Sequence, residues 1–362
     1  MTTRTTTISR VGRLRCWLIA LLAVMAGPVM AESLRIATWN VGLGRKGPGL
    51  LVQELSDGQD PQSAAVVRVL AALDADVVLL TDVDYDRGGV ALRLLAERLA
   101  AAGAPYPHRF AFRPNTGTQT GFDVDGNGRA GDPRDAQGYG LFSGQGGMAI
   151  LSRLPIDPAA ARDFSAFLWR DLPGSLADDP PDLAAVQRLA TTGFWDVPVM
   201  TEHGPLHLLA WHATPPVFDG PEDRNGRRNH DEATFWRLFL DGALPMAPPD
   251  APFVLLGDGN LDPADGDGRR EGIGGLLAHP GLTDPLPMGS HGRIEPAHRG
   301  DPALDTVLYD DLGGLRLDYV LPSSALAVTG AGVLGPAPDD PLWPDLQAAS
   351  RHFPVWVDVT LP

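Results

Sequence analysis

Residues 76–84 of the chain read Asp76-Val77-Val78-Leu79-Leu80-Thr81-Asp82-Val83-Asp84. The first part of this run is short, apolar and rich in β-branched side chains, which is typical of a strand buried on both faces. An earlier run over residues 34–40 also has the character of a strand and ends in Asn40. Between the two runs, Asp60 is a good N-cap and Pro61 suits the first position of a helix. We therefore expect two strands with a helix between them.

The alternation of strand and helix signals continues along the chain. We expect a helix over about residues 90–102, which ends at Gly103, and another that begins at a capping-box-like pair, Asn229 and Glu232. Further strands are expected at residues 147–151, 206–211, 253–256, 317–321 and 355–359. Strands that interleave with helices favour a layered α/β architecture over separate all-α and all-β parts.

Long stretches rich in Gly, Pro and Asp separate these elements, at residues 115–146, 215–228, 263–271 and 289–314. They have the character of long loops on one domain and not of linkers between domains. We therefore expect a single domain over residues 32–362, with loop insertions near 115–146, 215–228 and 289–314. The short run Asp265-Gly266-Asp267-Gly268 indicates a turn.

The composition excludes several classes of protein. The chain has 362 residues, of which 44% are hydrophobic, and a single cysteine. One cysteine excludes an internal disulfide framework and a multi-cysteine zinc site, and the apolar content is too high for a disordered chain. The formal net charge is −16. This charge argues against indiscriminate coating of nucleic acid or anionic membranes, because both need a basic surface.

Residues 1–31 have the pattern of a secretory signal peptide. Four arginines precede an apolar run from Cys16 to Ala26, and Val29-Met30-Ala31 satisfies the small-residue rule for cleavage. A membrane anchor is the alternative, but the run is shorter than the ~20 residues that a spanning helix needs. Cleavage would remove four basic and no acidic residues, which leaves 25 basic and 45 acidic residues and a net charge of −20. We expect a secreted or periplasmic protein without stable membrane insertion.

Polar residues suited to metal or phosphate chemistry end several of the expected strands. They are Asn40, Asp82, His212, Asp258 with Asn260, Asp318 and His352. Each one alone is explained by the frequency of polar residues where strands end. Their recurrence at six strand ends of one chain indicates a common site.

Short motifs around these residues follow one another in a fixed order. From the N-terminus they are Trp39-Asn40-Val41, Leu80-Thr81-Asp82-Val83-Asp84, Gly147-Met148-Ala149-Ile150-Leu151-Ser152-Arg153, Trp211-His212, Gly257-Asp258-Gly259-Asn260, Leu317-Asp318-Tyr319-Val320 and Ser350-Arg351-His352-Phe353-Pro354-Val355. In this order the chain resembles the endonuclease/exonuclease/phosphatase superfamily, over essentially all of residues 32–362. The resemblance implies the DNase I-like fold, a four-layer α/β sandwich in which two packed mixed β-sheets are flanked by helices.

The resemblance also implies a reaction, the hydrolysis of phosphoester bonds by direct attack of water on phosphorus. Such a reaction needs an activated water, a place for the charge on the phosphoryl oxygens and help for the leaving oxygen. By analogy, Asp258 would orient or deprotonate the water, and Asn260 would hydrogen-bond the phosphate or fix that geometry. Asn40 and Asp82 would hold a divalent cation, Mg²⁺ or Mn²⁺.

Three further residues have roles by the same analogy. His352 would contact the scissile phosphate, and Asp318 would orient its imidazole through the other ring nitrogen. His212 would serve as a second acid near the leaving group. The superfamily includes deoxyribonucleases, abasic-site endonucleases, sphingomyelinases and inositol-polyphosphate phosphatases, so the resemblance identifies the reaction better than the substrate.

Two positions depart from the pattern of the superfamily. Asp82 stands where the superfamily usually has Glu, so the carboxylate is one methylene shorter. Arg351 stands where it commonly has Asp, in a Ser-Asp-His motif. A guanidinium repels a metal ion but can clamp a phosphate bidentately. Either the ion depends on Asn40, Asp82 and Asp84 alone, or the activity is altered or weak.

A separate acidic pattern lies in the loop over residues 115–146. Asp123, Asp125 and Asn127 supply oxygen atoms at positions 1, 3 and 5 of an EF-hand-type calcium loop, with Gly at position 6. Position 12 is Arg134 and not Glu. If calcium binds, the coordination shell must be closed by one of two nearby carboxylates, Asp132 or Asp135. A solvated acidic turn is the alternative.

The segment over residues 212–229 places three arginines directly after a candidate catalytic histidine: Arg224, Arg227 and Arg228. One interpretation is a lid or substrate loop whose arginines bind phosphate. The alternative is a salt-bridged surface loop.

Two functional hypotheses follow. The leading one is a secreted metal-dependent phosphoesterase that hydrolyses phosphodiesters, as a nuclease does, or phosphomonoesters, with nucleic acid or a small phosphorylated molecule as substrate. The competing hypothesis, which Arg351 and Asp82 motivate, is a calcium-stabilised binding protein of the same fold with weakened or lost catalysis. No protein partner is predicted.

Overall fold

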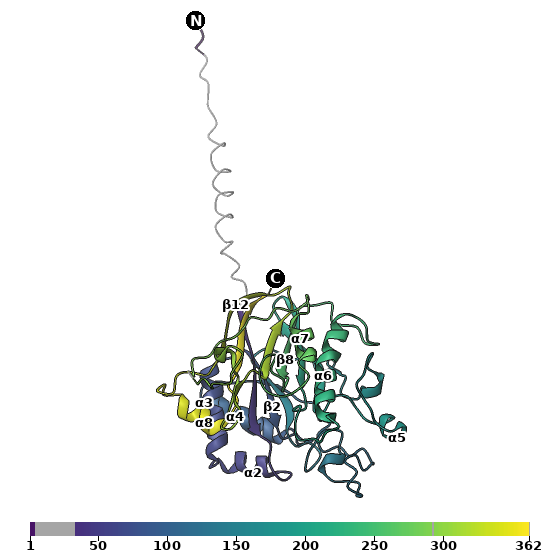
Figure 1. Cartoon of the computed structure of the whole chain (residues 1–362). Helices are drawn as coiled ribbons and strands as arrows, with labels where there is room; N and C mark the ends of the chain where they lie inside the picture. Colours follow the sequence, from purple (N-terminus) through teal and green to yellow (C-terminus); the bar gives the residue numbers. More distant parts are fainter. Residues whose placement is uncertain (4–32, 292, 362) are drawn as a thin grey trace. The chain divides into compact units, whose positions relative to one another are not determined.

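Each of two β-sheets is built around one pair of parallel strands, and all other strand pairs in both sheets are antiparallel. Figure 1 shows the computed structural model, which describes residues 1–3, 33–291 and 293–361. Residues 4–31 of the predicted signal peptide lie outside the described residues. Residues from Ser33 onward form one compact unit.

The first sheet has six strands in the order β12-β13-β1-β2-β4-β3. Its parallel pair is β1 and β2, and two helices connect these strands, one more than the sequence predicts. The strands are β1 (Ser33–Leu43), β2 (Val77–Val83), β3 (His108–Phe110), β4 (Gly147–Ser152), β12 (Ala327–Val333) and β13 (Val355–Thr360).

The second sheet has five strands in the order β11-β8-β7-β6-β5, with β7 and β8 as its parallel pair. A small separate hairpin of β9 and β10 follows β8 in the chain. The strands are β5 (Arg162–Asp163), β6 (Gly193–Thr201), β7 (Gly204–His212), β8 (Phe253–Asp258), β9 (Val307–Tyr309), β10 (Gly313–Leu315) and β11 (Asp318–Pro322).

The two sheets pack face to face, and helices cover their outer faces. Strands β1 and β2 contact β8 across the interface, and apolar side chains of both sheets, such as Ile36 and Leu256, share one core. A second core packs Trp236 and other side chains of helix α6 against the outer face of the second sheet. Figure 1 shows α3 and α8 on one side of the sheets and α6 and α7 on the other. The predicted α/β sandwich is therefore confirmed.

The helices are mostly short and begin close to the predicted positions. Asp60 caps α3, because its Oδ2 accepts the N–H of Ser63 at 2.7 Å. No helix of the described residues has both the length and the apolar character needed to cross a bilayer. The helices are α2 (Leu50–Asp57), α3 (Pro61–Leu73), α4 (Val90–Ala101), α5 (Pro181–Ala184), α6 (Arg224–Leu240), α7 (Glu271–Leu277) and α8 (Trp343–Ala349), with short 3₁₀ turns at Pro133–Asp135, Trp169–Asp171 and Pro302–Leu304.

The start of α6 differs from the prediction. The helix begins at Arg224, so Asn229 and Glu232 lie inside it and are fully buried. Their polar side chains do not cap the helix but bind backbone groups of other segments. From the sequence alone, a pair of residues that caps a helix looks the same as a pair of buried polar residues that bind other segments. Residues 224–228 of the expected loop insertion are consequently helical.

Candidate active site

The carboxyl ends of the two parallel strand pairs meet where the sheets face each other. Asn40 lies near the end of β1 and Asp258 is the last residue of β8. The side-chain amide of Asn40 donates a hydrogen bond of 2.9 Å to Oδ2 of Asp258, which joins the two sheets. In the second sheet, Asp258 is the cross-strand partner of both His212 on β7 and Asp318 on β11. This register places three predicted site residues side by side.

A β-bulge in β2 presents Asp82 to the cleft. The register of β2 against β4 shifts between Thr81 and Val83, and Asp82 has a φ of 52°. Such left-handed backbone is strained for a residue other than glycine and is found most often at functional sites. Two glycines leave room for the carboxylate, since a Cβ at Gly44 would lie 2.5 Å from its Oδ1 and a Cβ at Gly146 would lie 2.7 Å away.

Asp258 is held by donors on two sides. Its Oδ2 accepts from Asn40, and its Oδ1 accepts the backbone N–H of Asn260 at 2.9 Å. The side-chain amide of Asn260 donates to the carbonyl of Ala213, also at 2.9 Å. Of the two roles suggested for Asn260, these contacts show the second, the fixing of local geometry. The carboxyl group of Asp258 is fully buried, and this burial raises its pKa.

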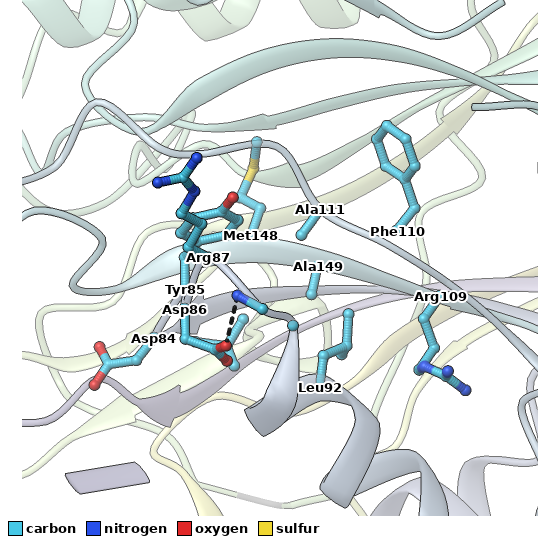
Figure 2. Close-up of a pocket in the computed structure, with 13 residues that line it drawn as sticks. Asp84, Tyr85, Asp86, Arg87, Leu92, Arg109, Phe110, Ala111, Met148 and Ala149 are labelled. Carbon is cyan, nitrogen blue, oxygen red and sulfur yellow. Dashed lines mark hydrogen bonds between the residues drawn. The ribbon is translucent and has the colours of Figure 1, made fainter. Parts of the chain in front are cut away.

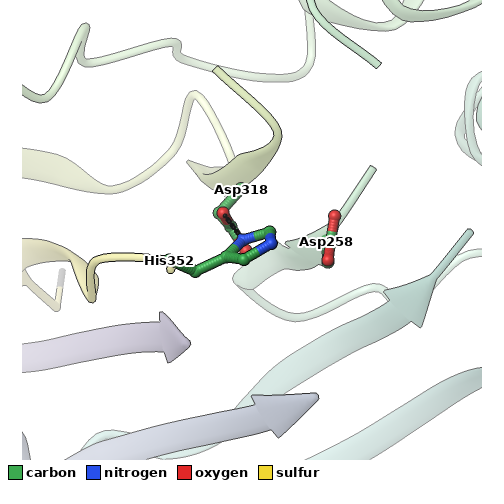
Figure 3. A group of neighbouring side chains, drawn as sticks. All are labelled: Asp258, Asp318 and His352. Carbon is green, nitrogen blue, oxygen red and sulfur yellow. Dashed lines mark hydrogen bonds and ion pairs between the residues drawn. The ribbon is translucent and has the colours of Figure 1, made fainter. Parts of the chain in front are cut away.

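His352 and Asp318 form a buried hydrogen-bonded pair. Nδ1 of His352 lies 2.8 Å from Oδ2 of Asp318, and Figure 3 shows the imidazole between Asp318 and Asp258. Burial favours the neutral ring, but the charges of Asp318 and Asp258 outweigh it and raise the pKa of His352 to about 9. The imidazole of His352 is therefore positively charged at neutral pH. The indole N–H of Trp39 fixes the backbone of His352 by donating to its carbonyl at 2.8 Å.

His212 has the opposite electrostatic character. Its Nε2 lies 3.7 Å from Oδ2 of Asp258. Burial lowers the pKa of His212 to about 4, so the ring is neutral at physiological pH. A neutral imidazole can donate one hydrogen bond, but it carries no extra proton to give to a leaving oxygen. This state differs from the acid role suggested by resemblance.

The resemblance assigns a divalent cation to Asn40 and Asp82, and a neighbouring group of three side chains could also hold one. Atoms of Asp258, Asp318 and His352 lie within 4.8 Å of one another, as ligands of one ion would. Hydrogen bonds already use both oxygens of Asp258 and Nδ1 of His352, whereas Oδ1 of Asp318 has no hydrogen-bond partner among the described residues. Burial and the charge of Asp258 raise the pKa of Asp82, which marks a carboxylate that would gain from a cation. Carboxylate and amide oxygens are the ligands that Mg²⁺ and Mn²⁺ prefer.

Asp84 does not join this group. Its carboxylate accepts the backbone N–H groups of Arg45 and Gly146, both at 3.0 Å. It lines a separate cavity of about 320 Å³ beside the start of α4, which Figure 2 shows. Burial raises the pKa of Asp84 to about 6. These hydrogen bonds hold the backbone next to Gly44 and at Gly146, the two glycines that lie against the Asp82 carboxylate. Asp84 is therefore a positioning residue for this bulge.

The main cleft has a volume of about 1090 Å³ and extends from Asp82 and His212 to the loop around Asp125 and to the start of α6. Arg134 lines it and is exposed. The exposed aromatic side chains Tyr139 and Phe218 lie on its wall. The cleft is thus large enough for a substrate with groups on both sides of a phosphate.

The arginines suggested as phosphate ligands are mostly engaged elsewhere. Arg228 is buried and donates to the backbone carbonyls of Leu189, Gln137 and Arg188. Arg224 pairs with Asp179 at 3.1 Å. These contacts differ from the expectation, because a phosphate ligand needs free donors.

Arg351 is exposed, and its guanidinium lies 6.0 Å from the centroid of the Tyr309 ring. A contact of this length is a weak cation–π interaction. It leaves the side chain available to an anionic substrate.

The calcium-like loop brings together Asp123, Asp125 and Asp135, whose oxygen atoms lie within 4.8 Å of one another. Of the two carboxylates suggested to close a calcium shell, Asp135 is the one that lies in this group, and its oxygens accept the backbone N–H groups of Val124, Gly131 and Asp132. The side-chain amide of Asn127 donates to Oδ2 of Asp132 at 2.6 Å, and its Oδ1 accepts the N–H of Arg129 at 2.9 Å.

Three residues that support the site were not identified as site residues from the sequence: Thr306, Asn229 and Glu232. Thr306 donates from its hydroxyl to Oδ2 of Asp318 at 2.8 Å and so supports the pair with His352. Asn229 donates to the carbonyls of Thr214 and Gly259, which ties together the loops after β7 and β8. Glu232 accepts the N–H groups of Thr191 and Thr214, both at 2.7 Å. Asn229 and Glu232 stood out in the sequence only as a capping pattern, and Thr306 did not stand out at all, so only spatial proximity identifies their role in the site.

The sequence profile of the Endonuclease/Exonuclease/phosphatase family matches residues 37–352. This range includes all the residues of the candidate active site, from Asn40 to His352. The chain belongs to this family, whose members are in general phosphoester hydrolases.

Several solved structures share the fold of this chain. An endonuclease/exonuclease/phosphatase from Beutenbergia cavernae is 20% identical with a TM-score of 0.55, and the match covers 91% of this chain and 72% of that one. An endonuclease/exonuclease/phosphatase family protein from Leptotrichia buccalis is 17% identical with a TM-score of 0.52, over 91% and 100% of the two chains. One from Bacteroides thetaiotaomicron is 14% identical with a TM-score of 0.52, over 92% and 99%. No curated protein matches the chain. At these identities the structures establish the fold alone.

Proposed function

We propose that the protein hydrolyses phosphoester bonds by direct attack of water on phosphorus, in the cleft between the two sheets. The observation that carries this proposal is the hydrogen bond between Asn40, one of the two candidate cation ligands, and Asp258, the candidate base. The pair of His352 and Asp318 completes the arrangement on the other side of Asp258.

Asp258 would orient the attacking water and accept its proton. Burial raises the pKa of this carboxyl and so makes it a stronger base than an exposed aspartate. As the bond from the water oxygen to phosphorus forms, the bond to the leaving oxygen breaks. Asn260 and Asn40 would hold the two oxygens of Asp258 in place throughout, because each donates to one of them.

His352 would stabilise the charge on the phosphoryl oxygens. Its pKa of about 9 keeps the ring protonated at neutral pH. Because Nδ1 is directed at Asp318, Nε2 is the nitrogen left to face the substrate. A fixed cation in a site shielded from water stabilises developing negative charge without reorganisation during the reaction.

Asn40 and Asp82 would hold the divalent cation, Mg²⁺ or Mn²⁺. When bound, such an ion neutralises phosphate charge and polarises the bond under attack. His212, which is neutral, would donate a hydrogen bond near the leaving oxygen.

The cleft favours a phosphodiester over a small monoester as substrate. Its volume of about 1090 Å³ reaches well beyond the catalytic residues to Arg134 and the aromatic side chains of Tyr139 and Phe218. A monoester of a small alcohol would leave most of this surface unused. The signal-peptide pattern of residues 1–31 supports the further proposal of export from the cytoplasm.

A substrate panel tests the function. Purified protein would be incubated with plasmid DNA, RNA, sphingomyelin and sugar or inositol phosphates, each with Mg²⁺, Mn²⁺ or Ca²⁺. We expect cleavage of at least one diester in the presence of Mg²⁺ or Mn²⁺. A folded protein that cleaves none of these substrates, with any of the ions, contradicts the proposal.

A second candidate function is a calcium-stabilised binding protein with weak or no catalysis. It is favoured by the convergence of Asp123, Asp125 and Asp135 and by Arg351 at the edge of the site. A calcium titration followed by thermal unfolding separates the two ion sites. Stabilisation that survives Asp82→Ala but is lost in Asp123→Asn would place calcium in the loop, and stabilisation lost in Asp82→Ala would place it in the cleft.

A further inference from the structure

Two loops meet through a cluster of charged side chains that does not line the main cleft. One loop follows β8 and contains Asp265, and the other precedes β9 and contains His298 and Asp305. The carboxylate of Asp265 ties the loops together, because it accepts the backbone N–H groups of Arg299 at 2.9 Å and Gly300 at 2.7 Å. The sequence indicated only a turn at Asp265.

The imidazole of His298 points between two carboxylates. Its Nε2 lies 3.6 Å from Oδ2 of Asp265 and 3.7 Å from Oδ1 of Asp305. The side chain of His298 is 6% exposed and that of Asp305 is 2% exposed, and Nε2 has no hydrogen-bond partner among the described residues. These separations are too long for hydrogen bonds. They are close to the roughly 3.4 Å between two ligand atoms that bind one ion tetrahedrally, with bonds of about 2.1 Å.

The charges of the cluster also indicate a missing cation. Oδ2 of Asp305 is buried without a hydrogen-bond partner in the described residues, whereas Glu295 is already ion-paired with Arg293. Burial and the charges of four neighbours, Asp262, Asp265, Glu295 and Asp301, raise the pKa of Asp305 to about 8. A buried carboxylate without a partner costs free energy that a bound cation would offset.

We propose that His298, Asp265 and Asp305 bind a divalent transition-metal ion, with Glu295 available as a further carboxylate ligand. A set that combines imidazole nitrogen with carboxylate oxygens suits Zn²⁺ or Mn²⁺, whereas Ca²⁺ and Mg²⁺ take sets of oxygen atoms. The group is wider than the two tight acidic groups described above. Ion binding would therefore draw its side chains together.

The position of this site gives it a link to the active site. Asp305 is followed by Thr306, whose hydroxyl donates to Asp318, the partner of His352. The backbone carbonyl of Thr306 also accepts the N–H of Phe353 at 2.7 Å, next to His352. An ion on Asp305 would thus fix the segment that supports the pair, without contact with the substrate.

The test is a titration of chelator-treated protein with Zn²⁺ alone, and separately with Mn²⁺ alone, followed by calorimetry and thermal unfolding. We expect His298→Gln and Asp305→Asn each to bind one equivalent fewer of the ion than the wild type. The matched controls are His203→Gln and Asp311→Asn, whose side chains are exposed, and they should bind as the wild type does. Equal stoichiometry in the wild type and both site variants would overturn the proposal.

Two further measurements guard against a variant that misfolds. Asp305→Asn removes charge repulsion, so the ion-free variant should unfold at a temperature no lower than that of the ion-free wild type. Crystals soaked in Zn²⁺ should show an anomalous scattering peak between His298 and Asp305. Anomalous peaks confined to the Asn40–Asp82 cleft or to the Asp123 loop would contradict this site while leaving the proposed hydrolysis intact.

Discussion

The side-chain amide of Asn40 lies 2.9 Å from Oδ2 of Asp258, and the hydrogen bond between them crosses from one β-sheet to the other. Each residue lies near the carboxyl end of a parallel strand pair, Asn40 on β1 and Asp258 on β8. Through this bond, the group proposed to hold a cation also orients the group proposed to activate water. The bond thus couples the two sheets at the candidate active site.

Replacement of Asn40 by Asp should disrupt catalysis more than folding. The variant exchanges a donor to Asp258 for a second carboxylate, whose repulsion would displace the base. We expect kcat for phosphodiester hydrolysis to fall by about 10²-fold, the scale of a lost catalytic positioning or proton-transfer contribution. The control is Asn127→Asp in an exposed loop, which should keep the wild-type kcat. A wild-type kcat for Asn40→Asp would show that the bond does not position Asp258.

The pair of His352 and Asp318 predicts a loss of activity at alkaline pH. The pKa of His352 is raised to about 9, so kcat/KM should fall as the pH rises above about 9. Asp318 is the first of the charges that raise this pKa. Asp318→Asn should therefore move the alkaline limb of the pH–rate profile to lower pH. A limb that stays at the same pH in the variant would rule out His352 as its origin.

The same pKa shift predicts how stability depends on pH. A histidine pKa raised from its ordinary value of about 6.5 means that the folded state binds the proton more tightly than the unfolded state does. The contribution to the free energy of unfolding is fully present below about pH 6.5 and is lost as the pH rises through 9. Urea unfolding between pH 6 and 10 measures it, and His352→Gln should flatten that dependence.

Gly44→Ala should weaken ion binding without altering any ligand. A Cβ at this position would lie 2.5 Å from Oδ1 of Asp82, so the carboxylate would have to move. We expect the apparent affinity for Mn²⁺ to fall at least tenfold in an activity titration. Gly47→Ala is the matched control, because its nearest neighbour is the flexible end of Leu50 at 3.3 Å. Equal Mn²⁺ dependence in both variants would contradict the placement of the ion at Asp82.

Asn229→Ala should destabilise the protein. The amide of Asn229 donates to the buried carbonyls of Thr214 and Gly259, at 2.7 and 2.9 Å. Each carbonyl left without a partner costs about 1–3 kcal/mol, so the loss of two such bonds should lower the free energy of unfolding by about 2–6 kcal/mol. Urea unfolding measures the change. Gln53→Ala, at an exposed position of α2, should change it by less than about 0.5 kcal/mol.

The sequence predicts the strands of the active site well, for a physical reason. A buried strand such as Val77–Val83 must be apolar along its length, and a polar residue such as Asp82 or Asp258 at its end then stands out. The order of the motifs, through the resemblance that it carries, also implied two packed β-sheets. Asp82, however, is placed by a bulge whose room comes from Gly44 and Gly146, and no pattern in the sequence marks that relationship.

Residues that act through buried contacts could not be predicted in this way. Thr306 supports Asp318 from a separate loop. Arg228, which appeared free to bind phosphate, donates instead to carbonyls that are distant in sequence. The start of α6 was misplaced because Asn229 and Glu232 bind loops and not the helix end. In each case the partner is determined by tertiary packing and leaves no local periodicity.

The central claim, hydrolysis at Asp258 between the two sheets, is tested most directly by the rate of phosphodiester hydrolysis in the wild type and in Asp258→Asn. The assay uses saturating Mn²⁺ or Mg²⁺, and circular dichroism confirms that both proteins are folded. The account predicts measurable turnover by the wild type and a fall of at least about 10³-fold in the variant, the scale of the loss of an essential catalytic group. A variant that retains the wild-type rate, or a folded wild type without turnover on any phosphoester, would contradict it.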